Sequence, residues 1–376
     1  MIIKRTIEKD IEAAFFKGKV IIVYGPRRVG KTTLVKEILG RFGSQTKYIN
    51  CDILDNRLAL EVLDNKKLRQ FLGDGKVFVL DEAQRVLNIG LALKILVDSY
   101  PDIQIIATGS SSFDLSNRIS EPLTGRTFSF VLYPISISEL KNSRAGFDLS
   151  KNLPKFLRFG GYPEIVSGKA QDPIGYLKDI SSNYLYKDAL EYENVKKPDI
   201  LVKLLQLLAF QIGNEVSYNE LAAKLEVNRD TVIRYIDLLE KAFVIFRLPP
   251  FARNLRNEIG RKNKIFFYDL GIRNALVNSF SDLDQREDIG GLWENFCIVE
   301  RQKLIQAKKW YRNIYFWRMQ NKKEIDYVED YGGRLYGYEF KWGMGRYSAP
   351  KEFLDEYKNS SVAIIDRSNC DEFLNL

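Results

Sequence analysis

The chain has no histidine among its 376 residues. This absence excludes Ser-His-Asp and Cys-His catalysis, histidine-ligated zinc and a histidine general base, because each needs an imidazole ring. Any chemistry must therefore use carboxylates, lysine, arginine, hydroxyl groups, backbone amides and a recruited hard cation such as Mg²⁺.

Cysteine is scarce as well, and long hydrophobic runs are missing. The three cysteines, Cys51, Cys297 and Cys370, are far apart and match no metal-ligand spacing, which fits a reducing cytoplasm. No apolar run reaches the length of a membrane span, and the N-terminal sequence MIIKRTIEKD is too polar for a signal peptide. We therefore expect a cytoplasmic protein with no membrane partner.

The composition that remains is typical of a globular protein. Hydrophobic residues make up 45% of the chain, enough to bury sizeable cores, and the length suggests two or three domains. The formal net charge of +8 favours polyanionic partners such as nucleic acid, and it equally suits a protein with a modest basic excess. Composition does not choose between these two interpretations.

The first chemical motif follows an apolar run, residues 20–24, which is typical of a buried parallel strand. The next residues, GPRRVGKT, match the pattern G-x-x-x-x-G-K-[ST], and a helical pattern comes after them. In this context the motif predicts a loop whose backbone N–H groups hold phosphates, rather than an ordinary glycine-rich turn. The predicted nucleotide-binding residues are Gly25, Pro26, Arg27, Arg28, Val29, Gly30, Lys31, Thr32 and Thr33.

A second apolar run, GKVFVLDEAQ, ends in two adjacent acids, Asp81 and Glu82. We expect Asp81 to hold Mg²⁺ together with the Thr32 hydroxyl, Glu82 to polarise the attacking water, and Lys31 to reach the β- and γ-phosphates. The alternative for the two acids is an exposed turn. A third run, DIQIIATGSSS, ends in the hydroxyl groups of Thr108, Ser110 and Ser111, each of which is a candidate γ-phosphate sensor.

Five candidate strands with helical segments between them predict an α/β fold, a parallel sheet sandwiched by helices. Besides the three runs above, the candidates are KYINCD (47–52) and TFSFVLYP (127–134). Ligands bind at the carboxyl ends of the strands in such sheets. The phosphate loop and Asp81 both fall at that edge.

Five motifs in this order make the sequence recognisable: GPRRVGKTTL, LDEAQ, TGSSS, LTGR (123–126) and GGYPE (160–164). Together they resemble the bacterial and archaeal AAA+/STAND-type predicted ATPases, which carry a C-terminal domain of uncertain function. The resemblance covers nearly the whole chain and implies ATP and Mg²⁺ as cofactors. It also implies that Gly161 and Pro163 lie near the adenine, unless GGYPE is a plain turn. Arg126 would be a charge-sensing catalytic arginine, in cis or in trans, or else a surface arginine.

The middle of the chain predicts two further units. Residues 166–197 look helical and resemble the small lid that follows such ATPase cores. Residues 198–270 predict helix, helix-turn-helix and hairpin, which is the order of a winged helix. Ser217 and Glu220 have the spacing of a capping box at the second helix.

Basic residues in this winged helix are candidate DNA contacts. Arg229 and Arg234 lie in the expected recognition helix. The alternative is a winged helix that packs against the nucleotide domain or binds protein, with its charges merely solvated. The expected wing carries one acid, Glu258, against the basic residues Arg253, Arg256, Arg261, Lys262 and Lys264.

The C-terminal region places acids in a predicted hairpin, residues 323–343. Asp326 lies in its first strand, and Glu339 and Lys341 share one face of the second. The two carboxylates would bind Mg²⁺ or Mn²⁺, and the lysine would orient a water for phosphodiester hydrolysis. With Glu294 on a preceding amphipathic helix, the pattern resembles the PD-(D/E)xK nuclease fold, although Ile325 stands where that motif has proline. The alternative is a fold retained for binding, whose charges pair with one another.

We therefore predict four segments: a P-loop ATPase core (1–165), a helical lid or linker (166–197), a winged helix (198–270) and a PD-(D/E)xK-like domain (271–376). The leading function is an ATPase whose nucleotide state controls the attached domains on nucleic acid. The alternative is an ATP-dependent regulatory switch that binds protein partners, with a catalytically inactive C-terminal domain. The sequence leaves the oligomeric state open.

Overall fold

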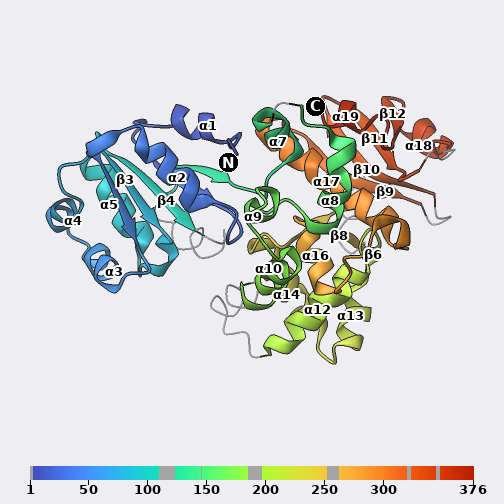
Figure 1. The fold of residues 1–376 in the computed structure, drawn as a ribbon, viewed down its shortest axis with the longest axis horizontal. Helices are drawn as coiled ribbons and strands as arrows, with labels where there is room; N and C mark the ends of the chain where they lie inside the picture. The colour runs from blue at the N-terminus through green and yellow to red at the C-terminus, as the bar shows by residue number, and fades with distance from the viewer. Residues whose placement is uncertain are drawn as a thin grey trace.

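The computed structural model describes residues 3–109, 123–144, 146–184, 197–251, 262–319, 323–343 and 348–376. Figure 1 shows two lobes joined near the N-terminus, with the first strands and helices in one lobe and the later elements in the other. None of the helices in the described ranges combines the length and hydrophobicity needed to cross a bilayer.

The first lobe is built on a parallel five-stranded sheet in the order β2-β3-β4-β1-β5. Three of the strands are buried along their whole length, as expected for a parallel sheet covered on both faces. The parallel sheet predicted from the five apolar runs is confirmed. The strands are β1 (Val20–Tyr24), β2 (Thr46–Asn50), β3 (Val77–Asp81), β4 (Gln104–Gly109) and β5 (Thr127–Val131).

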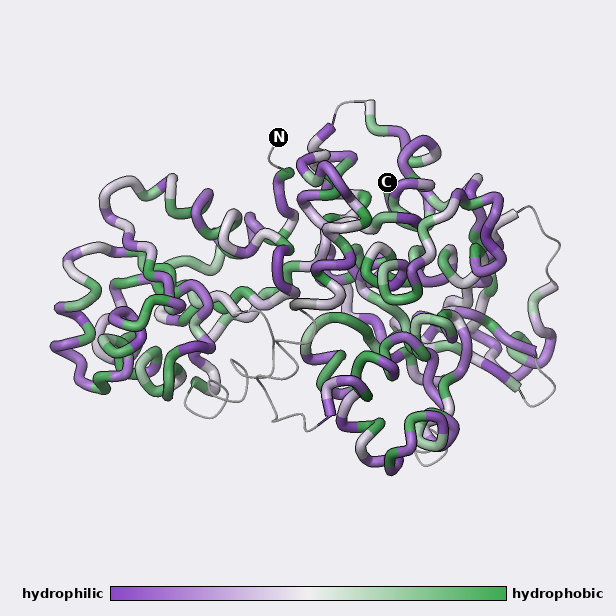
Figure 2. Tube along the Cα trace, turned by 60° about the horizontal axis from the view of Figure 1, so that its bottom comes forward, coloured by the Kyte–Doolittle hydropathy of each residue, from purple (hydrophilic) through white to green (hydrophobic). Residues whose placement is uncertain are grey.

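Helices cover both faces of this sheet, because alternate residues of a strand point to opposite sides. Val20 and Ile22 of β1 pack with the helices α3, α4 and α5, whereas Ile21 and Val23 pack with α1 and α2. Figure 2 shows hydrophobic stretches of chain in the interior of this lobe, with more polar stretches around them. The helices are α1 (Glu8–Ala13), α2 (Lys31–Gly40), α3 (Leu54–Glu61), α4 (Asn65–Leu72) and α5 (Ile89–Ser99), with short turns η1 (Gly43–Gln45) and η2 (Ala83–Arg85).

The second lobe begins earlier than the predicted boundary at residue 165. The helices α7 (Ile137–Ser143) and α8 (Leu149–Phe159) share a core with the C-terminal helix α17 (Ile289–Ala307). The backbone N–H of Ile137 also donates to Glu300 of α17 at 2.7 Å. The first lobe therefore ends near residue 134, because the side chains that follow find their apolar partners in the C-terminal half. Next come α9 (Pro163–Val166), α10 (Pro173–Asp179) and the π-helical turn η3 (Ile180–Tyr184).

The segment from residue 198 has the predicted order of elements. Ser217 accepts a hydrogen bond from the backbone N–H of Glu220 at 3.4 Å, as the expected N-cap of α13. The core of this unit extends to Phe280 and includes α16 (Leu270–Leu276), so the predicted boundary at 270 falls too early. The elements are α12 (Pro198–Phe210), β6 (Glu215–Val216), α13 (Tyr218–Lys224), α14 (Arg229–Lys241), β7 (Ile245–Leu248) and β8 (Asn263–Phe267), with an antiparallel sheet in the order β6-β8-β7.

The C-terminal unit is a four-stranded mixed sheet in the order β12-β11-β10-β9, packed against α17. The strands β10 and β11 are the predicted hairpin, with Tyr331 opposite Arg334 at its tip. The remaining bounds are β9 (Asn313–Arg318), β10 (Glu324–Tyr331), β11 (Arg334–Phe340), α18 (Lys351–Glu356), β12 (Ser360–Ile365), α19 (Cys370–Phe373) and the turn η4 (Leu283–Gln285).

Candidate nucleotide site

The loop between β1 and α2 is tightly folded around the Lys31 side chain. Its ammonium is buried and donates to the carbonyl oxygens of Gly25 at 2.8 Å and Pro26 at 2.9 Å. A side chain at Gly25 would collide with the Leu132 carbonyl oxygen, since a Cβ there would lie 2.3 Å from it. Only glycine therefore fits at the point where the loop leaves the strand.

Two residues beside this loop hold left-handed backbone conformations that side chains rarely adopt. Arg28 in the loop has φ +59°, and Glu82 after β3 has φ +55°. Such conformations cost free energy and persist where the surroundings enforce them, often at functional sites. The Glu82 carboxylate is held by the Gln84 side-chain amide at 2.5 Å.

Asp81 lies at the centre of a network of hydroxyl groups. Thr32 donates to its carboxylate at 2.8 Å, and Tyr48 and Thr108 donate to it as well. Burial, reinforced by the neighbouring Asp81 charge, raises the pKa of Tyr48, so this phenol stays protonated and donates. The Thr32 hydroxyl and the Asp81 carboxylate are adjacent hard oxygen ligands, which fit Mg²⁺.

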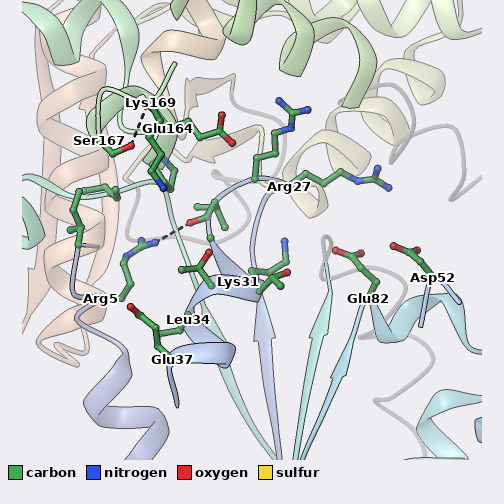
Figure 3. Close-up of a pocket in the computed structure, with 18 of the residues that line it drawn as sticks. Arg5, Arg27, Lys31, Leu34, Glu37, Asp52, Glu82, Glu164, Ser167 and Lys169 are labelled. Atoms are coloured by element: carbon green, nitrogen blue, oxygen red, sulfur yellow. Dashed lines mark hydrogen bonds between the residues drawn. The ribbon is translucent and has the colours of Figure 1, made fainter. Parts of the chain in front are cut away.

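A cavity of about 570 Å³ lies directly above the loop (Figure 3). Lys31, Thr32 and Glu82 line it from the first lobe. Pro163 and Glu164 line it from the second lobe. The cavity is therefore formed between the lobes, and Figure 3 shows Glu164, Ser167 and Lys169 on the side facing Lys31.

Arg5 connects the phosphate loop to the second lobe. Its buried guanidinium donates to the Val29 carbonyl at 3.0 Å, to the Tyr133 carbonyl and to the Glu139 carboxylate at 3.1 Å. Burial alone would raise the pKa of Glu139, but Arg5 and the backbone N–H groups of Ser136 and Thr6 outweigh it and hold the pKa below its usual range.

The other residues predicted to bind the nucleotide do not all line the cavity. Pro163 packs over the loop, 3.8 Å from the position a Cβ would take on Gly30, and it lines the cavity. Gly161 is buried outside the cavity lining, its N–H bonded to Asp269 at 2.7 Å. Ser110 lies outside the described residues.

Arg126 lies at the amino ends of the strands, whereas the phosphate loop lies at their carboxyl ends. It precedes β5, where Val20 pairs with Thr127, so it is roughly 17 Å, one strand length, from the carboxyl ends. Its side chain pairs with Asp98 at 2.8 Å and is half-exposed. Arg126 therefore does not reach the cavity of its own chain, and the role in cis is corrected on this geometry.

Several cavity residues were missed by the sequence analysis. Arg5, Asp52 and Arg85 line the cavity, and Tyr48 holds Asp81 from β2. Asp52 is the last residue of the predicted strand 47–52, so its position at a strand end was a usable signal. Arg5 gave none, because its contacts are made with residues far away in the sequence.

The candidate DNA contacts are only partly described. Arg229 and Arg234 are exposed on α14, and Lys262 is exposed before β8. Arg253, Arg256 and Arg261 lie outside the described residues. Lys264 was predicted to be one of the basic residues of the wing that contact DNA, and this prediction is corrected. Its ammonium is buried and so cannot contact a phosphate backbone.

Two of the predicted nuclease residues, Glu294 and Asp326, meet at Lys264 together with Glu324. Its Nζ lies 2.8 Å from Glu294, 2.5 Å from Glu324 and 3.7 Å from Asp326. Beside them Lys341 pairs with Glu339 at 2.7 Å.

Burial sets the ionisation of this cluster. Burial raises the pKa of Glu294 to about 8 and that of Glu339 to about 7, and the Asp326 charge adds to both shifts. Burial would lower the pKa of Lys264, but the surrounding carboxylates raise it instead, so its ammonium stays charged. In the described part of the chain, no three cysteine, aspartate or glutamate side chains are arranged to hold a metal ion.

Comparison with known families assigns the first lobe. Residues 17–141 match the sequence profile of the AAA domain, and residues 150–283 and 289–369 match two domains of unknown function, DUF8612 and DUF4143. Residues 17–141 therefore form an AAA-type P-loop ATPase domain, which implies nucleotide binding. The profile limits fall near the lobe boundary seen in the structure.

Individual relatives resemble most of the chain. An uncharacterized protein of Mycobacterium tuberculosis is 27% identical over 346 residues, covering 91% of this chain and 74% of the relative. An uncharacterized protein of Methanocaldococcus jannaschii is 29% identical over 351 residues, covering 86% and 75%. Among solved structures, Pif1 helicase from Candida albicans aligns with a TM-score of 0.27 at 14% identity, covering 48% of each chain, which is too low to bear on fold or function.

Proposed function

We propose that the protein is a Mg²⁺-dependent ATPase whose nucleotide state sets the position of the second lobe, which acts on nucleic acid. The observation that carries the proposal is the cavity above Lys31, because residues of both lobes line it. A nucleotide bound there would contact both lobes at once. Loss of its γ-phosphate would then change the contacts that hold them together.

The chain's own residues divide the work of hydrolysis. Lys31 and the loop N–H groups bind the phosphates, and Thr32 and Asp81 are the residues that would hold Mg²⁺. When bound, Mg²⁺ neutralises charge on the phosphate oxygens. Glu82, oriented by Gln84, accepts a proton from the attacking water.

Two contacts support transmission between the lobes. The Arg28 guanidinium of the phosphate loop lies 5.3 Å from the centre of the Tyr176 ring on α10. The Arg5 guanidinium joins the Val29 carbonyl of the loop to Glu139 on α7. A change in the loop on hydrolysis would therefore be felt by two helices of the second lobe.

The test is ATP binding and turnover by matched variants. Lys31→Ala should abolish both, whereas Glu82→Gln should still bind ATP but not hydrolyse it. Lys67→Ala, an exposed lysine on α4, is the control and should match wild type. Full turnover by Glu82→Gln would reject the assigned role of this carboxylate.

For the unit that begins at residue 198 and extends to Phe280 we propose a winged helix that binds DNA. The order α12, β6, α13, α14, β7, β8 supports it, and so does the exposure of Arg229 and Arg234 on α14. DNA affinity should fall steeply with added salt, and the double substitution of these arginines by alanine should weaken binding and flatten the salt dependence. Lys241→Ala at the far end of the same helix is the control. Binding that does not depend on salt would favour a protein partner.

For the C-terminal unit we propose a PD-(D/E)xK-like fold. The helix α17 followed by β9, β10 and β11 supports it, as do the positions of Asp326, Glu339 and Lys341. Phosphodiester cleavage would need a divalent cation between the carboxylates. The specific observation that favours the alternative, a fold that binds without cutting, is the Lys264 ammonium among these acids.

A further inference from the structure

Lys264 is a buried lysine that the ATPase does not need. It lies on β8, and only 2% of its side chain is exposed. A lysine is rarely so deeply buried unless its charge is paired. Its Nζ also lies 5.5 Å from the centre of the Phe316 ring, so one side of the ammonium faces an aromatic surface.

The partners of this ammonium come from a different unit of the fold. Glu294 is on α17, and Glu324 and Asp326 are on β10, whereas Lys264 belongs to the three-stranded sheet. Its contacts at 2.5 to 3.7 Å place the positive charge at the point where the three carboxylates converge. A divalent cation drawn to these acids would need the same point, and the three carboxylates are not arranged to hold one while the ammonium lies between them.

The ammonium is fixed in this position by the backbone that carries it. Asn295 of α17 donates to the Phe267 carbonyl and accepts from the Phe267 N–H, both at 2.8 Å. Phe266, between Lys264 and Phe267, is fully buried in the core shared with α17. The strand β8 is therefore bound to the helix that carries Glu294, and withdrawing the lysine would break this core.

We propose that Lys264 is the resident cation of the C-terminal carboxylate cluster and takes the place of a divalent metal ion. The domain then keeps a nuclease-like scaffold as a binding module and needs no metal to balance its acids. This inference rests on the fold proposed for the C-terminal unit, and it is independent of ATP hydrolysis in the other lobe.

A metal ion held by Asp326 and Glu339 is the rival that an experiment must detect. The buried Oε2 of Glu339 has no hydrogen-bond partner within the described part of the chain. Asp326 uses one oxygen to accept from the Phe340 N–H at 2.9 Å. The two residues are therefore the pair to substitute in the wild-type background.

The experiment is a Mn²⁺ titration of the full chain without nucleotide, followed by electron paramagnetic resonance. The proteins compared are wild type, Asp326→Asn, Glu339→Gln, Lys264→Met and the double variant Lys264→Met with Asp326→Asn. The phosphate loop is the same in all five, so differences report the C-terminal cluster. Wild type, Asp326→Asn and Glu339→Gln should bind the same amount of Mn²⁺. Lys264→Met should bind additional Mn²⁺, and the double variant should lose it.

Two results would overturn the inference. One is a loss of bound Mn²⁺ when Asp326 or Glu339 is substituted in wild type, which would mean that a metal ion binds there beside Lys264. The other is a folded Lys264→Met protein that binds no more Mn²⁺ than wild type. If Lys264→Met does not fold, the wild-type comparison decides alone. ATP turnover, measured on the same preparations, reports separately on the ATPase proposal and should match wild type in every folded variant.

Discussion

Replacing Glu139 by glutamine tests the link between the phosphate loop and the second lobe. The Glu139 carboxylate accepts from Arg5 Nε at 3.1 Å, from the Thr6 N–H at 2.9 Å and from the Ser136 N–H at 3.0 Å. Glutamine keeps the shape but loses the charge. In either orientation of the glutamine amide, its NH₂ group also points at an N–H donor that needs an accepting oxygen.

The size of the expected destabilisation follows from burial, since the side chains of Arg5 and Glu139 are only 8% and 5% exposed. Breaking a buried ion pair by removing one partner costs about 3–5 kcal/mol, because the other charge stays buried and uncompensated. At about 2 °C per kcal/mol for a unit of this size, Glu139→Gln should lower the melting temperature by about 6–10 °C. The affinity for ATP should fall too, because Arg5 also holds Val29 of the loop.

The pH dependence gives this prediction a second readout. The pKa of Glu139 in the folded protein lies below its ordinary value of 4.5. The stabilisation is therefore fully present above pH 4.5 and is lost as the pH falls through the folded pKa. The gap in melting temperature between wild type and Glu139→Gln should be full at neutral pH and should close in acid.

Thermal melts monitored by fluorescence measure the loss in melting temperature and its dependence on pH. Glu220→Gln is the matched control, because it removes an exposed carboxylate that pairs with Lys224 at 2.8 Å. Exposed pairs of this kind contribute little, so the control should melt with wild type. Equal melting temperatures for wild type and Glu139→Gln at neutral pH would refute the reasoning.

Three further predictions concern single sites. Gly160→Ala should destabilise the fold far more than Gly168→Ala in chemical denaturation. Both glycines have φ near +72°, but only a Cβ at Gly160 would meet the Asp269 carboxylate, at 2.1 Å. Equal losses of stability in the two variants would mean that backbone strain alone matters. Tyr48→Phe should raise the Mg²⁺ concentration needed for half-maximal ATP turnover, because Asp81 loses a hydroxyl that orients it; an unchanged Mg²⁺ dependence would contradict this. The three cysteines are buried, so a thiol reagent should label them only after denaturant is added.

Local sequence patterns are enough to predict the nucleotide-binding half of this protein. The loop ending at Lys31 and the acids at Asp81 and Glu82 follow apolar strands directly, so short-range pattern and chain order place them at one edge of a parallel sheet. The hairpin at residues 323–343 is likewise local, since alternation and a Gly-Gly turn specify it.

Which residues far apart in the sequence meet becomes visible in the folded chain. Lys264 looked like one more basic residue of a wing, yet β8 carries it into the acids of α17 and β10. Arg126 stands close to a predicted strand, but a parallel register puts it at the far edge. Arg5 reaches Glu139 across the chain. Burial and charge pairing depend on neighbours that are far apart in the sequence. Local patterns therefore specify the helices and strands, but not which side chains meet when these elements pack.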